Sequence, residues 1–265
     1  MVRHAWRTRA NRARVDPAPG GVSASTGNMI RMTETQVAFV IAMTEEAEGI
    51  FDLDSSWTEL GLAPFPVYRR GDDETQAVVI VSGIGTTNAA AATQHVLDRF
   101  APERIVNMGV VGCLNHEIAI GEVHAVSTCA FFDVDVTAFG YKIGQIPDTE
   151  VHEYQLEADT SVPVPTARLL SGDTFVTGRD GFHPELAGFD ADFVDMELTA
   201  IAHTLLRNGK LEQLESYKTP SDYCDGDSPD AFDENLPFAL SKLAIVAERI
   251  MQVRGVAAES AGVAR

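Results

Sequence analysis

Short apolar runs alternate with segments of helical periodicity along most of the chain. The runs that predict strands are 37–43, 66–70, 77–81, 104–108, 121–128 and 167–176, with a short apolar approach at 193–194. Helices are predicted after residue 44, from the turn at 82–88 to about residue 99, at 198–206 and at 230–253. The unbroken apolarity of 37–43 indicates a strand buried on both faces. Alternating strands and helices predict an α/β fold with a largely parallel sheet.

Three stretches do not fit this simple alternation. Residues 131–141 are rich in β-formers and aromatics, and their tip is interpreted as a binding loop or a dimer contact. Residues 147–165 are polar without clear periodicity and are interpreted as a surface loop. Residues 211–217 are unusually polar for a central strand.

Composition narrows the range of partners. The 265 residues are 45% hydrophobic, which is ample for a core, and they carry a net charge of −19. This acidity argues against a nucleic-acid partner, because phosphate binding needs a basic surface. No apolar run reaches the roughly 18 residues of a membrane span, so no membrane partner is expected. The three cysteines form no metal-binding pattern and are interpreted as reduced, structural residues of a cytoplasmic protein.

The two ends of the chain differ from the rest. Residues 1–31 are rich in arginine, contain one acidic residue and lack the apolar core of a secretory signal. We expect a disordered tail or a mis-assigned start, since Met29 or Met32 lies directly before the first strand. Residues 32–256 are predicted to form a single domain, and residues 257–265 a tail of small residues.

Acidic side chains occur where predicted strands give way to helices. Asp195 and Glu197 lie before the helix at 198–206, and Glu46 follows the first strand, with Thr44 as the expected helix N-cap. Ligands of open α/β sheets collect at the carboxyl ends of strands, so these positions suit functional acids. A purely structural alternative stands beside this, because the helix macrodipole by itself favours acids in the first turn.

Glycine-containing turns follow two of the strands. Gly83 and Gly85 precede a helix whose free N–H groups could bind an anion. The motif lacks the third glycine of a dinucleotide fingerprint and the lysine of a P-loop, so tight packing of strand against helix is favoured. The second turn, at 109–112, allows a flat ligand to approach the backbone.

A set of short motifs follows one another in a definite order. The most specific is DVTAFGY at 135–141, and the others are AMTEE at 42–46, SGIG at 82–85, GQIP at 144–147, SGDTF at 171–175, MELTAIAH at 196–203, SD at 221–222 and FDE at 232–234. This set resembles the 5'-methylthioadenosine/S-adenosylhomocysteine nucleosidases, over about residues 37–251. The resemblance implies a nucleoside phosphorylase-like fold, a three-layer α/β/α sandwich with a central mixed, largely parallel sheet. It also implies a homodimer that uses no metal or organic cofactor.

The resemblance assigns the chemistry to three carboxyl groups. Hydrolysis of an N-glycosidic bond needs an acid to activate the leaving base and a base to activate water. By resemblance, Asp222 is the acid at the purine N7, which requires a carboxyl group kept protonated near neutral pH by a dry site. Glu46 resembles the base. Glu197 resembles the carboxylate that binds the ribose hydroxyls and stabilises the growing cation.

The remaining contacts with a nucleoside substrate are also implied by the resemblance. Met196 would pack against the sugar, and Phe232 would cover the alkylthio group. Phe175 would stack on adenine, and the backbone of Val176 would read the edge of the base. Three residues would be lent to the pocket of the partner subunit: Val136, Phe139 and Tyr141. The implied set is completed by Met43, Val110, Gly112, Asp195, Lys218 and Ser221.

Several positions depart from the family pattern. Val110 replaces a serine that helps to hold ribose or water, Lys218 replaces an arginine beside the water site, and Asp195 replaces a glutamate. The helix usually found between 145 and 171 is largely deleted. These departures keep the adenine and carboxylate machinery but alter the floor of the ribose site.

Three functions remain open on this evidence. The first is hydrolysis of 5'-methylthioadenosine and S-adenosylhomocysteine to adenine and the 5-substituted ribose. The second is hydrolysis of a related 5'-substituted nucleoside of the futalosine type. The third is nucleoside binding with weak or lost turnover. Phosphorolysis is disfavoured, because no arginine lies near 82–88 to hold phosphate.

Overall fold

The computed structural model describes residues 35–53, 56–61, 64–71, 76–178, 186, 189–225 and 228–256. All of them belong to one compact unit, Met32–Arg265. The tails predicted at 1–31 and 257–265 lie outside the described residues. The predicted division of the chain into two tails and one domain therefore stays a prediction.

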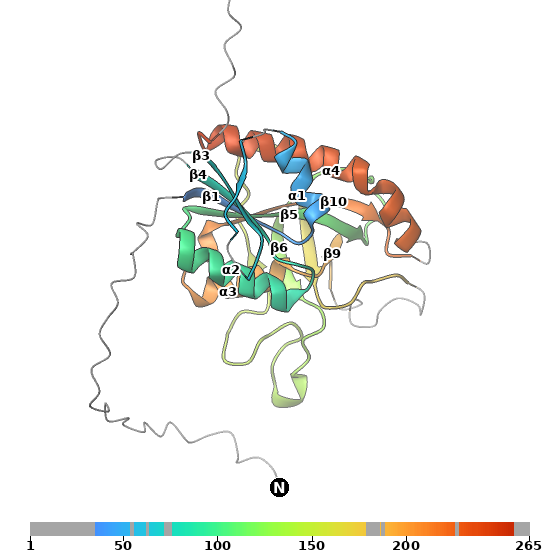
Figure 1. The fold of residues 1–265 in the computed structure, drawn as a ribbon. Helices are drawn as coiled ribbons and strands as arrows, with labels where there is room; N and C mark the ends of the chain where they lie inside the picture. Colours follow the sequence, from blue (N-terminus) through green and yellow to red (C-terminus); the bar gives the residue numbers. More distant parts are fainter. Residues whose placement is uncertain are drawn as a thin grey trace, which may run out of the picture. The chain divides into compact units, whose positions relative to one another are not determined.

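Strands and helices alternate along the described chain, as the apolar pattern predicts (Figure 1). The strands are β1 (Thr35–Ile41), β2 (Thr58–Glu59), β3 (Val67–Gly71), β4 (Gln76–Val81), β5 (Arg104–Cys113), β6 (His124–Phe131), β7 (Tyr154–Gln155), β8 (Thr166–Ser171), β9 (Phe193–Asp195) and β10 (Leu214–Asp222). The helices are α1 (Thr44–Phe51), α2 (Thr86–Phe100), α3 (Leu198–Arg207) and α4 (Ser228–Val253), with 3-10 turns at Thr137–Phe139 and Leu211–Gln213.

The strands form one mixed sheet in the order β10-β6-β8-β9-β5-β1-β4-β3-β2, with β7 paired to β6. β10 also pairs with β5, so that β5, β10, β6, β8 and β9 close into a ring. The long pairings of β1 with β4, β5 with β10 and β6 with β8 are parallel. Antiparallel pairings of only two residues join β9 to β5 and β6 to β10. The prediction of a mixed, largely parallel sheet is confirmed.

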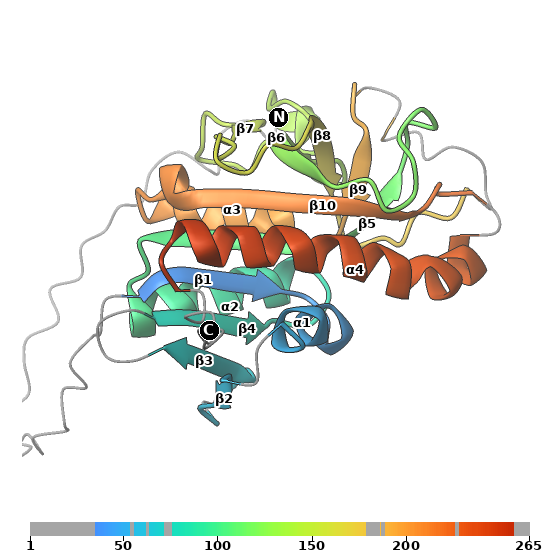
Figure 2. The same ribbon diagram turned by 90° about the horizontal axis from the view of Figure 1, so that it is seen from above.

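Helices cover both faces of the sheet, with α1 and α4 on one face and α2 and α3 on the other (Figures 1 and 2). The side chains of β1 explain this arrangement. Val37, Phe39 and Ile41 belong to the core shared with α1 and α4, whereas Ala38 and Val40 belong to the core shared with α2 and α3. All five are at most 1% exposed, because alternate side chains point to opposite, covered faces. The three-layer α/β/α prediction is confirmed.

The segment between β6 and β8 departs from the predicted pattern. Its β-formers leave the sheet after Phe131 and form a projecting loop with a 3-10 turn, in which Phe139 is 75% exposed (light green in Figure 1). The predicted surface loop contains β7, where Tyr154 is fully buried and its hydroxyl is 2.7 Å from Nδ1 of His203. Residues 145–171 contain no α-helix, as the deletion implied.

β10 is a central strand despite its polar sequence. It pairs with β5 and β6, and all nine of its residues are buried. Glu215 accepts a hydrogen bond from Arg254, just after α4, at 2.6 Å, and a second from the Tyr217 hydroxyl at 3.2 Å. Arg254 also binds Asp159 at 2.8 Å. The polar residues of β10 therefore connect the strand to the end of α4 and to the loop before β8.

Removal of Arg254 should test this connection. Arg254→Ala leaves the Glu215 carboxylate buried, and among the described residues its remaining ion-pair partner is Arg104, 3.8 Å away. We expect the free energy of unfolding to fall by about 2 kcal/mol, less than for a fully buried pair because Arg254 is partly exposed. Urea unfolding at pH 7 measures this loss.

Two further variants sharpen the test. Arg249→Ala removes an exposed arginine near the same helix end and should change the free energy of unfolding by less than about 0.5 kcal/mol. Adding Glu215→Gln to Arg254→Ala should restore part of the lost stability, because no unpaired charge is then buried. A double variant no more stable than Arg254→Ala would contradict this explanation.

Candidate active site

A cavity lies at the carboxyl ends of β1, β4, β5, β8, β9 and β10, where ligand sites of α/β sheets occur. Its free space is about 630 Å³ with the open mouth included. Four carboxyl groups reach it, from Glu46, Asp195, Glu197 and Asp222. The other lining residues are Ala42, Met43, Ile84, Val110, Val111, Gly112, Thr174, Phe175, Val176, Val194, Met196, Ser221 and Phe232.

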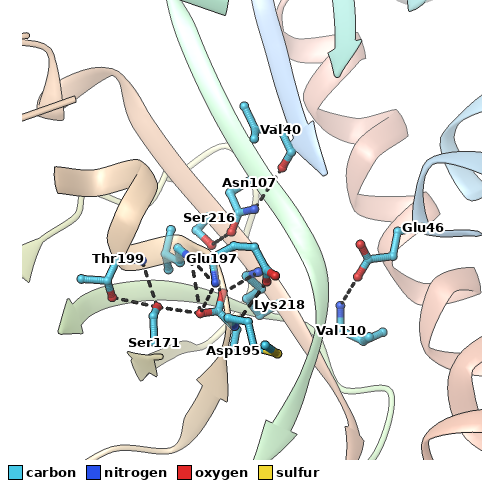
Figure 3. Close-up of polar contacts among 12 residues, drawn as sticks. Val40, Glu46, Asn107, Val110, Ser171, Asp195, Glu197, Thr199, Ser216 and Lys218 are labelled. Atoms are coloured by element: carbon cyan, nitrogen blue, oxygen red, sulfur yellow. Dashed lines mark hydrogen bonds and ion pairs between the residues drawn. The ribbon is translucent and has the colours of Figure 1, made fainter. Parts of the chain in front are cut away.

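Glu46 is held by backbone groups from two strand ends. Its Oε2 accepts a hydrogen bond from the N–H of Met43 at 3.0 Å. Its Oε1 accepts one from the N–H of Val110 at 2.9 Å (Figure 3). Met43 rather than Thr44 is the N-cap of α1, so the predicted cap was wrong by one residue. A Cβ on Gly109 would lie 2.6 Å from Oε1, which explains the glycine. Burial raises the pKa of Glu46, although the charge of Lys218 and these N–H groups act in the opposite direction.

Glu197 comes immediately before α3 but turns its carboxylate away from that helix. Its Oε1 accepts a hydrogen bond from the N–H of Gly85 at 2.8 Å. Gly85 has a φ of 106°, which a residue with a side chain rarely adopts, so the glycine-containing turn presents this N–H. Burial, followed by the negative charge of Asp195, raises the pKa of Glu197 to about 7.

Asp195 is the carboxylate that accepts the first backbone N–H groups of α3, although the N-cap residue itself is Glu197. It accepts hydrogen bonds from the N–H groups of Glu197 at 3.2 Å and Leu198 at 3.1 Å, and from the Ser171 hydroxyl at 2.6 Å. The ammonium group of Lys218 lies 2.9 Å from Oδ2 of the same carboxylate. The structural interpretation of acids at this joint therefore applies to Asp195, whereas Glu197 remains directed at the cavity.

Asp222 ends β10 and is 1% exposed. Its Oδ1 accepts a hydrogen bond from the N–H of Cys224 at 2.9 Å, and its Oδ2 accepts one from the hydroxyl of Ser221 at 3.0 Å. Cys224 holds this position with a φ of 55°, in the left-handed region. Burial raises the pKa of Asp222, although these hydrogen bonds act in the opposite direction. In the part of the chain that the structure describes, no ion pair reaches this carboxyl group.

Apolar side chains form the mouth and the floor of the cavity. The rings of Phe175 and Phe232 meet edge to face, with centroids 6.2 Å apart. Phe175 is 47% exposed and Ile84 is 52% exposed, so both are available to a bound molecule. Val110 presents an apolar side chain where its backbone N–H holds Glu46. The arrangement suits a ligand with a flat or apolar portion and a few polar groups.

Most of the residues proposed from the sequence meet in this cavity. They are Met43, Glu46, Val110, Gly112, Phe175, Val176, Asp195, Met196, Glu197, Ser221, Asp222 and Phe232. Lys218 does not line it, because its side chain is 2% exposed and paired with Asp195. Val136, Phe139 and Tyr141 lie on the projecting loop outside this cavity, and their contribution to a partner's pocket stays a prediction.

Sequence reasoning missed five residues of the lining. Four of them, Ala42, Val111, Thr174 and Val194, are each adjacent in sequence to a residue that was proposed. The fifth, Ile84, lies between the two glycines of the turn at 82–88. The strand-end position of the proposed residues was the available signal, since a cavity wall at a strand end includes its neighbours.

Neither a metal centre nor a membrane segment is found in the described ranges. Within them, no group of three or more His, Cys, Asp or Glu residues is arranged to hold a metal ion. The described helices also include none that is both long and apolar enough to span a membrane. The predictions of no metal and no membrane partner remain predictions.

Comparisons with known proteins agree with the fold and the cavity. The phosphorylase superfamily matches residues 36–252. A 5'-methylthioadenosine/S-adenosylhomocysteine nucleosidase of Staphylococcus carnosus is 31% identical over 75% of this chain and 91% of its own length. The nucleosidase of that name from Neisseria meningitidis, solved with methylthio-immucillin-A, has a TM-score of 0.73 at 28% identity over 83% of this chain and 99% of that chain. Futalosine hydrolase of Helicobacter pylori shares the fold, with a TM-score of 0.75 at 20% identity over 84% of this chain and 99% of that chain.

The chain belongs to the phosphorylase superfamily and, within it, to the 5'-methylthioadenosine/S-adenosylhomocysteine nucleosidase family. Both levels of the resemblance stated from the sequence motifs are confirmed.

Glu197→Gln should show how much the raised pKa of Glu197 lowers the free energy of unfolding at neutral and higher pH. The pKa of Glu197 is about 7 in the folded protein and near 4.5 in the unfolded chain, so the folded state binds the proton more tightly. The contribution of Glu197 to stability therefore decreases as the pH rises from about 4.5 to 7. The neutral variant should be more stable than the parent by roughly 2–3 kcal/mol at pH 8, and by less than about 1 kcal/mol at pH 5.

Urea unfolding at the two pH values measures this difference. Glu48→Gln, on the exposed face of α1, is the matched control and should leave the pH dependence of unfolding unchanged. If the Glu197→Gln and parent proteins lose stability in parallel between pH 5 and pH 8, Glu197 does not have a raised pKa.

Proposed function

We propose that this chain hydrolyses the N-glycosidic bond of 5'-methylthioadenosine and S-adenosylhomocysteine, releasing adenine and the 5-substituted ribose. The observation that carries the proposal is the meeting of Glu46, Glu197 and Asp222 in one cavity with an apolar mouth. These are the acids that the reaction needs, and they come from three separate strand ends. Relatives that match most of the chain are nucleosidases for these two substrates.

Asp222 is proposed as the general acid. Departure of adenine leaves an oxocarbenium-like ribosyl cation, so a proton delivered to the purine N7 makes the base a better leaving group. Burial raises the pKa of Asp222, which favours the protonated form that can donate. The absence of any described cation beside Asp222 agrees with this role, because a paired carboxyl group would ionise more readily.

Glu46 and Glu197 are proposed to act as carboxylates. Each oxygen of Glu46 accepts one backbone N–H, which leaves further lone pairs to orient a water and take its proton. The hydroxide equivalent forms a bond to C1' as the bond from C1' to nitrogen breaks, and the proton from Asp222 stays on adenine. Glu197 would accept hydrogen bonds from the ribose hydroxyls and stabilise the positive charge that develops on the sugar.

The other residues that line the cavity are assigned to the base, the sugar and the alkylthio group of the proposed substrate. Phe175 and Phe232, which meet edge to face at the mouth, suit stacking on adenine and cover for the alkylthio group. Met196 and Met43 lie in the wall beside the proposed ribose position. Val176 and Ser221 also line the cavity, and we propose that the backbone of Val176, together with Ser221, recognises the edge of the base.

We also infer a cytoplasmic homodimer. An open groove between α2 and α3 is lined largely by small side chains, among them Ala90, Ala91 and Ala200. It supports association with a second copy, whose projecting loop would bring Val136, Phe139 and Tyr141 to this cavity. Three buried free thiols, Cys113, Cys129 and Cys224, are in keeping with a reducing compartment.

Product analysis should test the activity and its alternatives together. Purified protein is incubated with 5'-methylthioadenosine, S-adenosylhomocysteine and aminodeoxyfutalosine, with and without phosphate, and free base is followed. We expect adenine from the first two substrates at a rate that phosphate does not change. Base release from aminodeoxyfutalosine alone would favour the second function, phosphate dependence would indicate a phosphorylase, and no release from any substrate would leave a binding protein.

Asp222→Asn should abolish most of the turnover while the protein still folds. The amide keeps the shape of the carboxyl group, can still accept the Cys224 N–H and can donate to the Ser221 hydroxyl. It cannot deliver a proton, so kcat should fall by about 10²–10⁴-fold. Asp98→Asn, on the exposed face of α2, is the control with unchanged kcat. A folded Asp222→Asn protein of parental activity would show that the acid is assigned to the wrong residue.

A further inference from the structure

A buried lysine lies behind the wall of the cavity. Lys218, on β10, has a side chain that is 2% exposed, and its Nζ is 2.9 Å from Oδ2 of Asp195 (Figure 3). Lysine is seldom fully buried unless it is paired. Because Lys218 lies outside the cavity lining, direct contact with a substrate does not explain why its charge is kept there.

Several titratable groups face the Lys218 ammonium. Asp195 of β9 and Glu197 at the start of α3 approach from one side, Glu46 of α1 from another, and the Cys129 thiol of β6 is also near. Burial alone would lower the pKa of Lys218, but the negative charges of Asp195, Glu197 and Glu46 outweigh it and the pKa is raised. Across the described ranges, Lys218 is the only base in an ion pair with a carboxylate of the cavity.

Asp195 transmits the position of Lys218 to Glu197. While one oxygen of Asp195 meets the ammonium, the carboxylate also accepts the N–H groups of Glu197 and Leu198. The Ser171 hydroxyl donates to the same Asp195 carboxylate at 2.6 Å. The backbone turn that directs Glu197 into the cavity is therefore fixed from β10 and β8 as well as from its own strand.

Hydrogen bonds to the neighbouring strands fix the part of β10 that carries Lys218. Ser216, two residues before Lys218 on the same strand, donates to Oδ1 of Asn107 at 3.4 Å. The Asn107 amide donates in turn to the carbonyl of Val40 at 3.0 Å. These contacts join β10 to β5 and β1, as Figure 3 shows, so the position of Lys218 is set by three neighbouring strands.

We propose that Lys218 and Asp195 form a positioning pair, in which Asp195 fixes the turn that carries Glu197 and Lys218 supplies the positive charge that Glu46 and Glu197 share. The inference rests on the proposed function of those two carboxylates. Lys218 and Asp195 are two of the positions that differ from the family pattern, and although they are far apart in sequence their side chains contact each other. The compact ammonium of Lys218 beside the short side chain of Asp195 makes a different ion pair from the planar, two-pronged contact of an arginine.

The pH dependence of catalysis distinguishes this role from a structural one. With 5'-methylthioadenosine, kcat/KM should rise on the acid side as Glu46 and Glu197 ionise, and fall on the alkaline side as Asp222 ionises. Lys218→Met removes the attraction that favours the two carboxylates, so the acid limb should move upward by about 1 pH unit or more. The alkaline limb should stay in place, kcat should fall by about 10²-fold, and KM should change by less than about threefold.

Matched variants predict different directions of change. Lys218→Arg keeps the charge, so its acid limb should stay within about 0.3 pH unit of the parent. Asp195→Asn removes a negative charge that raises the pKa of Glu197, so its acid limb should move downward. Lys210→Met, in the partly exposed turn after α3 and outside the cavity lining, is the control that should leave both limbs unchanged.

A second measurement works without turnover. Titration of protein labelled with ¹³C at the glutamate carboxyl carbons, with the Glu197 signal identified by its loss in Glu197→Gln, reads the pKa of Glu197 directly. If no substrate is hydrolysed, the proposed function fails while this titration still tests the pair. An acid limb and a Glu197 titration that both stay in place in Lys218→Met would overturn the proposal. If that variant does not fold, an unshifted Asp195→Asn would do so.

Discussion

The shared charge of one buried lysine is the constraint on which the cavity depends. Three carboxylates, Glu46, Asp195 and Glu197, face Lys218 from separate elements. Burial of a charge is unfavourable unless it is paired and hydrogen-bonded. Asp195 is satisfied by direct contact with the ammonium and by N–H donors, whereas among the described residues Glu46 and Glu197 are contacted only by backbone donors. Glu46 and Glu197 therefore lie in a dry site with raised pKa values. Raised pKa values suit a reaction in which both carboxyl groups exchange protons or bind charge near neutral pH.

Distance from that lysine separates the proposed acid from the proposed carboxylates. Asp222 lies at the end of the same strand as Lys218, and its pKa is governed first by burial, which raises it, and then by hydrogen bonds from Cys224 and Ser221, which act in the opposite direction. Pairs of carboxyl groups whose environments differ in this way are how enzymes obtain an acid and a base from one kind of side chain. The different environments of these carboxyl groups reduce the free energy of unfolding, since neutral residues at the same positions would not have to bury charge.

β10 carries two charged clusters that do different things. Near its start, Glu215 pairs with Arg254 and thereby connects the end of α4 to the sheet. Further along, Lys218 supports the cavity from behind, and Asp222 ends the strand at the cavity itself. A strand of such polarity stays central because each buried charge is paired or hydrogen-bonded. The same strand therefore holds the outer helix in place and positions the chemical groups.

The sequence by itself determined the class of fold and most of the cavity. Continuous apolar runs such as 37–43 identify strands covered on both faces, and acids at strand ends identify Glu46 and Glu197. Asp222 came from the resemblance of the ordered motifs to a known family. These signals are local, because periodicity and position within an element need only neighbouring residues. Only the tertiary structure decided that Lys218 turns away from the cavity and meets Asp195. That contact depends on the pairing of both β9 and β10 with β5, a register between strands that no local pattern contains.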